Sequence, residues 1–129
     1  MREEINTSNA PKAIGPYTQA IKANGMLFLS GQIALIPDTM EMNDSSIETE
    51  TNQVLDNLTA VLKEGGCAFN DVIRTEIFLK DMNDFAVVNK LYEEKLEGVN
   101  PKPARFTVEV ARLPKDARIE ISLVAVCKD

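Results

Sequence analysis

Histidine is absent from this chain of 129 residues, and so is tryptophan. Without an imidazole the chain has no Ser-His-Asp or Cys-His catalytic group, no imidazole general base, and none of the histidine ligands that most zinc and iron sites use. Any catalysis must therefore use Arg, Glu, Tyr, Ser or Thr side chains, backbone amides and water. We expect no metal site.

Long apolar runs and an excess of basic residues are also missing. No apolar run approaches the ~20 residues that span a bilayer. The start, Met1-Arg2-Glu3-Glu4, lacks the apolar segment of a secretory signal. The net charge of −6 argues against broad binding to a phosphate backbone, which needs a basic face. We therefore expect a cytoplasmic protein with no membrane partner, and nucleic acid is not the expected ligand.

Cysteine is scarce, because Cys67 and Cys127 are the only two in the sequence. Two cysteines are too few for a disulfide framework, so we expect them to be small unpaired hydrophobic side chains in a reducing compartment. Hydrophobic residues make up 44% of the chain and charged residues 26%, as in ordinary globular proteins. The length predicts a single domain over residues 1–129, with the polar residues 1–10 poorly ordered.

The first half of the chain predicts a hairpin followed by a helix. Residues 17–23 and 26–34 form the two strands, joined by Asn24-Gly25. Gly31 lies inside the second strand, which indicates a bulge or a close approach to the backbone. Ser45 and Glu48 have the spacing of a capping box, and apolar residues then recur at helical spacing until Gly65-Gly66.

The second half predicts a strand over residues 72–80, a helix from the cap at Asp81–Asp84 to Leu96, and strands over 103–111 and 119–126. The order β-β-α-β-α-β-β predicts an α+β two-layer sandwich, in which a mixed sheet carries both helices on one face. The last strand is apolar on both sides, yet no helix is left to cover the second face. This pattern predicts self-association.

Arg105 and Glu120 stand in the two final β-branched strands, where an unpaired charge is costly to bury. A structural interpretation makes Arg105 an ion-pair residue and pairs Glu120 with Arg118 or Lys115. A functional interpretation makes the pair the chemical centre. If the two strands form a hairpin, Arg105 and Glu120 lie on opposite faces. Either a bulge changes the register, or the two residues meet across a subunit boundary.

Several fragments that match one known family lie in order along nearly the whole chain. They are Ile14-Gly15-Pro16-Tyr17-Thr18-Gln19-Ala20, Ser30-Gly31-Gln32, Asp81-Met82-Asn83-Asp84-Phe85 with Val88-Asn89, Pro103-Ala104-Arg105, and Val110-Ala111-Arg112-Leu113-Pro114-Lys115 with Ile119-Glu120-Ile121. With these fragments the chain resembles the Rid (YjgF) family, and specifically its RidA-type branch of 2-iminobutanoate/2-iminopropanoate deaminases. The resemblance implies a chorismate-mutase-like fold and a homotrimer with clefts between subunits. It also implies cofactor-independent hydrolysis of reactive 2-imino or enamine acids, such as 2-aminoacrylate, to 2-keto acids and ammonia, which protects other enzymes.

The residues at the matching positions suit that chemistry. The planar fork of Arg105 can hold a substrate carboxylate by two parallel hydrogen bonds. Glu120 can orient and deprotonate the attacking water. The other expected substrate contacts are the Gly31 N–H, the Thr107 hydroxyl or carbonyl at the imine nitrogen, and the side chains of Tyr17, Ser30 and Asn89.

Two departures from the family pattern concern substrate preference. Thr107 stands where many members have cysteine, and Phe106 replaces a residue that is usually small.

Two other functions also stay open. One is a sensor that binds 2-keto acids through Arg105 without turnover. The other is an endoribonuclease or translation inhibitor, which the net charge of −6 disfavours.

Overall fold

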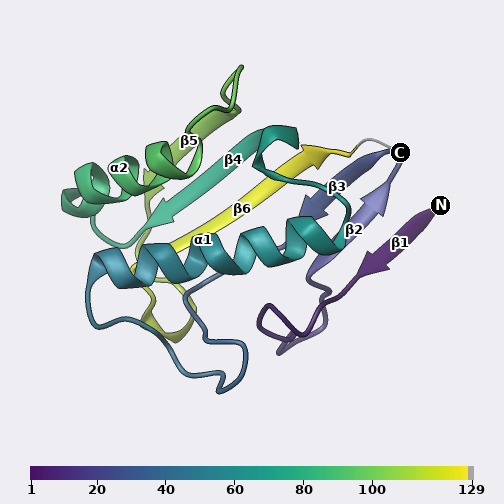
Figure 1. Cartoon of the computed structure of the whole chain (residues 1–129). Coiled ribbons are helices and arrows are strands. Elements are labelled where there is room, and N and C mark those ends of the chain that lie inside the picture. The colour runs from purple at the N-terminus through teal and green to yellow at the C-terminus, as the bar shows by residue number, and fades with distance from the viewer. Residues whose placement is uncertain (128–129) are drawn as a thin grey trace.

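The structure is a computed structural model that describes residues 1–127 (Figure 1). One six-stranded sheet has the order β1-β2-β3-β6-β4-β5, and two helices pack on one of its faces. The elements are β1 (Arg2–Ile5), β2 (Ala20–Ala23), β3 (Met26–Leu29), α1 (Ile47–Glu64), β4 (Val72–Leu79), α2 (Phe85–Lys95), β5 (Ala104–Glu109) and β6 (Ile119–Val126). The predicted α+β two-layer class is confirmed. No helix within residues 1–127 has the length and apolar character needed to cross a membrane.

The first residues are ordered, so the prediction for residues 1–10 is wrong. β1 pairs antiparallel with β2, from Arg2 opposite Ala23 to Ile5 opposite Ala20. The buried Gln19 amide fixes the next segment, because its Oε1 accepts from the Thr7 N–H and its Nε2 donates to backbone carbonyls of the same segment. Composition did not reveal this strand because its stability comes from a partner about 20 residues away in the chain.

The hairpin and the helix predicted for the first half are present, but β2 begins at Ala20 and β3 ends at Leu29, so both strands are shorter than predicted and Gly31 lies beyond β3. Asn24 and Gly25 both have positive φ, 53° and 75°, as a tight hairpin turn between β2 and β3 requires. The cap of α1 is Ser46, whose Oγ accepts from the Thr49 N–H at 3.0 Å, so the predicted Ser45–Glu48 capping box is wrong by one residue. α1 ends at Gly65, as predicted.

The last two strands do not form a hairpin, because β4 lies between them. β4 runs parallel to β5 and antiparallel to β6. The α2 crossover returns β5 to the outer side of β4, and β6 takes the inner side, where its alternate residues are fully buried. Arg105 lies opposite Thr75, which lies opposite Leu123, whereas Glu120 lies opposite Phe78. The two predicted site residues are therefore on opposite faces, as expected, although through a different topology.

The sheet face that carries no helix exposes large apolar side chains. Among residues 1–127 they include Phe28, Phe106, Val108 and Val126, which are 36–45% exposed. The structure therefore has the apolar sheet face that the sequence predicted, which no helix of the same chain covers. Its self-association remains a prediction.

Cys67 and Cys127 form a disulfide, so the prediction that they are unpaired is wrong. Their Cα atoms are 5.3 Å apart, within the range that a disulfide spans. Cys67 follows the end of α1 and Cys127 follows β6, and both are buried. Their sequence separation of 60 residues hid the pairing, because only the packing of α1 on the sheet brings them together.

Reduction of this disulfide is expected to lower the free energy of unfolding by roughly 4 kcal/mol, because the open chain regains the entropy of a long loop. Urea unfolding with and without a reductant measures the loss. The Cys67→Ser/Cys127→Ser variant serves as the control, since it should unfold at the reduced midpoint under both conditions. Equal midpoints for the oxidised and reduced wild-type chain would contradict the prediction.

Candidate active site

Glu120 lies on β6 with its carboxylate packed against Gly31. A Cβ atom added at Gly31 would overlap the Glu120 carboxylate, at 2.9 Å from its Cδ. Gln32 holds the two segments in this position by exchanging two backbone hydrogen bonds with Ile121, of 2.9 and 3.2 Å. The close approach predicted for Gly31 is confirmed, and the approaching group is the candidate general base.

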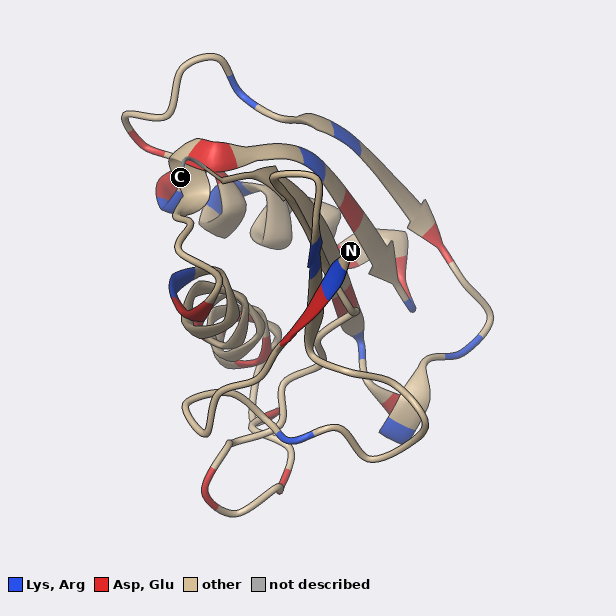
Figure 2. Cartoon of the chain, turned by 90° about the vertical axis from the view of Figure 1, so that its right-hand side faces the viewer, with Lys and Arg blue, Asp and Glu red and all other residues tan. Residues whose placement is uncertain are grey.

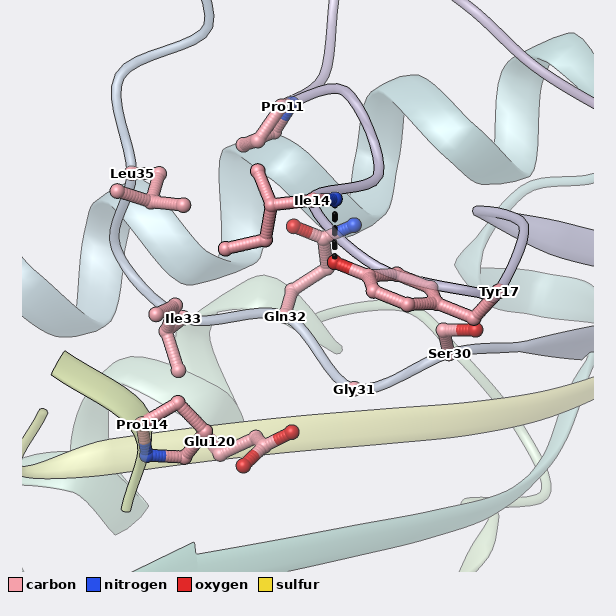
Figure 3. A pocket seen from close by; sticks show the side chains of 10 residues that line it. All are labelled: Pro11, Ile14, Tyr17, Ser30, Gly31, Gln32, Ile33, Leu35, Pro114 and Glu120. Atoms are coloured by element: carbon pink, nitrogen blue, oxygen red, sulfur yellow. Dashed lines mark hydrogen bonds between the residues drawn. The ribbon is translucent and has the colours of Figure 1, made fainter. Parts of the chain in front are cut away.

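A cavity of about 350 Å³ opens beside this pair (Figure 3). It brings together four of the residues predicted from the sequence, Tyr17, Ser30, Gly31 and Glu120. Its remaining wall, which the sequence interpretation missed, is mainly apolar and consists of Pro11, Ile14, Gln32, Ile33, Leu35 and Pro114. These residues come from three separate loops, so no local pattern marks them as neighbours. Ile14, Gln32 and Pro114 carried a signal, because each stands in a fragment that matches the family.

The environment of Glu120 favours a proton-transfer role over a surface ion pair. Partial burial raises the pKa of Glu120 above the ordinary value of 4.5. Arg118, the cation considered as its partner, instead binds the buried Glu50 through its backbone N–H and its Nε, both at 2.7 Å. No basic side chain within residues 1–127 forms an ion pair with Glu120. A desolvated carboxylate in a cavity is suited to accept a proton from water.

Tyr17 and Ser30 differ in how free their polar atoms are. The Ser30 Oγ donates its hydrogen to the Thr18 carbonyl at 2.6 Å, so it can offer a ligand only an acceptor. Tyr17 is 49% exposed, and its Oη accepts a long bond of 3.4 Å from the Ile14 N–H. The Gly31 N–H has no acceptor among the residues that the structure describes. Tyr17 and Gly31 are therefore the donors that remain available.

Arg105 belongs to a second cavity, also about 350 Å³, between α2 and β5. Its Nη1 donates to Asn89 Oδ1 at 2.6 Å, and its guanidinium lies 5.3 Å from the Tyr92 ring centre and 5.6 Å from that of Phe85. Within residues 1–127 no carboxylate forms an ion pair with Arg105, contrary to the structural interpretation. The positive charge is held in place by neutral groups and is open to an anion.

Thr107 and Phe106, the two departures from the family pattern, lie on opposite faces of β5. The Thr107 Oγ1 is buried on the helix-bearing face and has no hydrogen-bond partner among the described residues. Phe106 lies on the uncovered face, where its ring meets Phe78 edge-on at 5.9 Å and the Arg74 guanidinium at 5.2 Å. Phe106 lines neither cavity and instead shapes the uncovered face.

One chain does not bring Arg105 and Glu120 together. β4 separates their strands, and the residues point to opposite faces of the sheet. The register shift of β4 falls between Val72 and Arg74, and the pairing from Arg74 to Leu79 is continuous, so a bulge does not align the two residues. The chain thus presents two half-sites, one with a free cation and one with a partly buried carboxylate.

Comparison with known proteins identifies the family. The family described as Endoribonuclease L-PSP matches residues 7–127. The chain belongs to the Rid (YjgF) family. A RutC family protein of Synechocystis is 54% identical over 123 residues, which cover 95% of this chain and 94% of that protein. The 2-iminobutanoate/2-iminopropanoate deaminase of Mus musculus is 41% identical over 126 residues, 98% of this chain and 92% of that protein. The crystal structure of E. coli TdcF with bound serine superimposes with a TM-score of 0.92 at 37% identity, covering 98% of this Rid chain and 99% of that one.

Proposed function

We propose that this Rid protein hydrolyses 2-imino and enamine acids, such as 2-aminoacrylate, to 2-keto acids and ammonia, and so protects other enzymes from these intermediates. The observation that carries the proposal is the Arg105 guanidinium, which faces a cavity and forms no ion pair with any carboxylate among residues 1–127. A planar guanidinium matches the carboxylate that every 2-imino acid carries. The mouse deaminase, and the serine bound to TdcF, support a small amino-acid-like substrate.

The active unit is a homotrimer with sites at the subunit boundaries. Two observations support this assembly. The Arg105 and Glu120 half-sites face away from one another in one chain, and the uncovered sheet face exposes apolar side chains. In a cyclic trimer each contact joins unlike surfaces of neighbouring subunits, so the Arg105 half-site of one copy can meet the Glu120 half-site of the next.

In this mechanism Arg105 holds the substrate carboxylate, and Asn89 fixes the plane of the guanidinium. The free Gly31 N–H of the neighbouring subunit donates to the same carboxylate, because Gly31 lies beside Glu120 in that half-site. These contacts place the C=N carbon beside Glu120 of the neighbouring subunit. Holding substrate and water in reach of each other is mainly a proximity effect, worth up to ~7–11 kcal/mol in ideal cases.

Glu120 then carries the two water protons to nitrogen in turn. As the water oxygen bonds to the C=N carbon, one water proton passes to the Glu120 carboxylate, the C=N π electrons move to nitrogen, and Glu120 donates that proton to nitrogen to give a neutral carbinolamine. The Glu120 carboxylate next takes the proton of the carbinol hydroxyl and donates it to the same nitrogen, so that the C–N bond breaks, the keto group forms and ammonia leaves. The Thr107 hydroxyl, an expected contact of the imine nitrogen, takes no part in this mechanism, because its Oγ1 is buried and Thr107 lines neither cavity. The raised pKa of Glu120 suits both halves of this cycle.

A coupled assay tests the proposal. A pyridoxal-phosphate dehydratase generates 2-aminoacrylate, and keto-acid release is timed with and without this protein, with the Arg105→Ala variant as the blank. We expect acceleration by the wild-type chain alone. No acceleration, or equal acceleration by Arg105→Ala, would contradict the deaminase function. Keto-acid binding without turnover would instead support a sensor, which the complete Arg105 cavity of a single chain also permits.

An RNA-directed function has less support from the surface. Figure 2 shows basic residues interspersed with acidic ones along the strands and helices of this side rather than gathered into one basic face. The net charge of −6 works against a polyanion. We therefore assign the small-molecule function to this chain, and steeply salt-dependent RNA cleavage would overturn that choice.

The contact between Gly31 and Glu120 gives a direct test of the carboxylate's position. Gly31→Ala is expected to lower kcat by about 10- to 100-fold, because the new Cβ displaces the Glu120 carboxylate and small misplacements of catalytic groups have effects of this size. KM should change less than kcat, since alanine keeps the backbone N–H that contacts the substrate carboxylate and Arg105 lies on another strand. Steady-state kinetics and thermal unfolding of the same sample separate displacement from unfolding. An unchanged kcat would contradict the role given to this contact.

A further inference from the structure

The cavity that contains Arg105 holds a second cation, Lys102. The Lys102 Nζ donates to the carbonyls of Leu96 and Val99, each at 2.8 Å, just beyond the end of α2. An ammonium group has three N–H donors, so one remains for a ligand. Within residues 1–127 Lys102 forms no ion pair with an acidic side chain. The carbonyls at the C-terminal end of a helix compensate only part of its charge.

The two cations are fixed independently of each other. Arg105 is held on β5 by the Asn89 side chain, and only one of its five N–H donors is used in that bond. Lys102 is held by backbone carbonyls, which removes most of the freedom that a lysine side chain ordinarily has. A ligand with two anionic ends would therefore meet two donors that are already in position, which lowers the entropy cost of binding.

The rest of the cavity wall agrees with a short dianion. Tyr92, Leu96 and Pro103 give the cavity apolar surface, suited to the methylene groups of a short chain. Glu93 is the one acidic residue in the lining of this cavity, so the two cations outnumber it.

We propose that Lys102 forms a second carboxylate subsite, so that the protein accepts 2-imino and 2-keto acids that carry a second carboxylate at the far end of a short carbon chain. The inference rests on the proposed function, because Arg105 must hold the first carboxylate. It goes beyond that function by naming a substrate class. The remaining N–H of Lys102 binds the distal carboxylate, and Glu93 opposes the binding through its like charge.

Calorimetric binding of two matched keto acids tests the subsite. 2-Oxoglutarate and 2-oxopentanoate have the same carbon chain, and only the former ends in a second carboxylate. We expect 2-oxoglutarate to bind the wild-type protein more tightly. Lys102→Met should raise the Kd of 2-oxoglutarate about tenfold, the loss of one charge-assisted hydrogen bond, and leave 2-oxopentanoate unchanged. Glu93→Gln should shift the ratio of the two Kd values in the opposite direction.

Lys102→Met also removes two hydrogen bonds to carbonyls near the end of α2, which lowers stability. The ratio of the two Kd values on one sample controls for this loss, because partial unfolding weakens the binding of both keto acids equally. A Lys102→Met variant that binds both keto acids with the wild-type ratio would overturn the subsite and leave the deaminase function intact. Failure of 2-oxopentanoate to bind the wild-type chain, or binding that survives Arg105→Ala, would overturn the Arg105 anchor and with it both proposals.

Discussion

Glu120→Gln is expected to lower kcat for imine hydrolysis by about 10²- to 10⁴-fold, the contribution of a positioned general base. Glutamine keeps the size of the side chain and its contact with Gly31 but cannot accept the water proton. Binding of 2-keto acids should persist, because the cation that holds them lies in the other half-site. Kinetics and calorimetry on the same sample measure the two effects. A variant that retains turnover would remove Glu120 from the mechanism.

The pH dependence of the wild-type enzyme follows from the same carboxylate. Burial raises the pKa of Glu120 above 4.5, and the base must be ionised to take the first proton. We therefore expect kcat/KM to rise with pH through an apparent pKa above that of an ordinary glutamate. In the Glu120→Gln variant, kcat/KM should no longer fall at acidic pH. If Glu120 had only a structural role, this fall at acidic pH would remain in the variant.

Stability should change in the opposite sense to activity. When the pKa of a carboxyl group is higher in the folded state, the folded state binds more protons, so stability falls as pH rises through the folded pKa. At neutral pH the wild-type chain thus carries an ionised carboxylate that burial disfavours. Glu120→Gln is expected to unfold at higher urea concentration than wild type at pH 7, and with a smaller difference at pH 4.

Mixed trimers of Arg105→Ala and Glu120→Gln subunits are expected to regain about a quarter of the wild-type activity. Each variant alone lacks one half of every site. In random mixtures, a boundary pairs an intact Arg105 half-site with an intact Glu120 half-site in about one case of four. This recovery exceeds the residual activity of either parent by one to two orders of magnitude or more, given the loss expected for a missing catalytic group.

The experiment needs subunits that assemble at random, so the two variants are best co-expressed at equal levels and purified together through one shared tag, which keeps the random mixture on which the figure of one in four depends. Co-expression of wild type with a chain that carries both substitutions calibrates the assay, because it also leaves about a quarter of the boundaries intact. Mixtures with no more activity than their parents would show that the two residues do not share a site across subunits.

Several features of the molecule were predictable because they depend on residues close together in the chain. Asn24-Gly25 sets the turn of the first hairpin, and the apolar spacing of residues 47–64 sets the buried face of α1. The opposite faces of Arg105 and Glu120 agree with the expectation, although they follow from the registers of β5 and β6 on β4 and not from a hairpin. The capping residue of α1 was missed by one position, since Ser45 and Ser46 are both adequate caps and only the geometry selects Ser46.

What the sequence by itself determined is the class of fold, the family and the identity of the charged residues on which the proposed chemistry depends. The tertiary structure alone decided that β4 separates β5 from β6, that β1 joins the sheet, that Cys67 pairs with Cys127, and that Phe106 lies on the uncovered face. It also decided that Gly31 receives the Glu120 carboxylate and that Lys102 shares the cavity of Arg105. The physical reason is that turns, caps and periodicity are local, whereas these arrangements join residues distant in sequence or depend on how side chains pack in space.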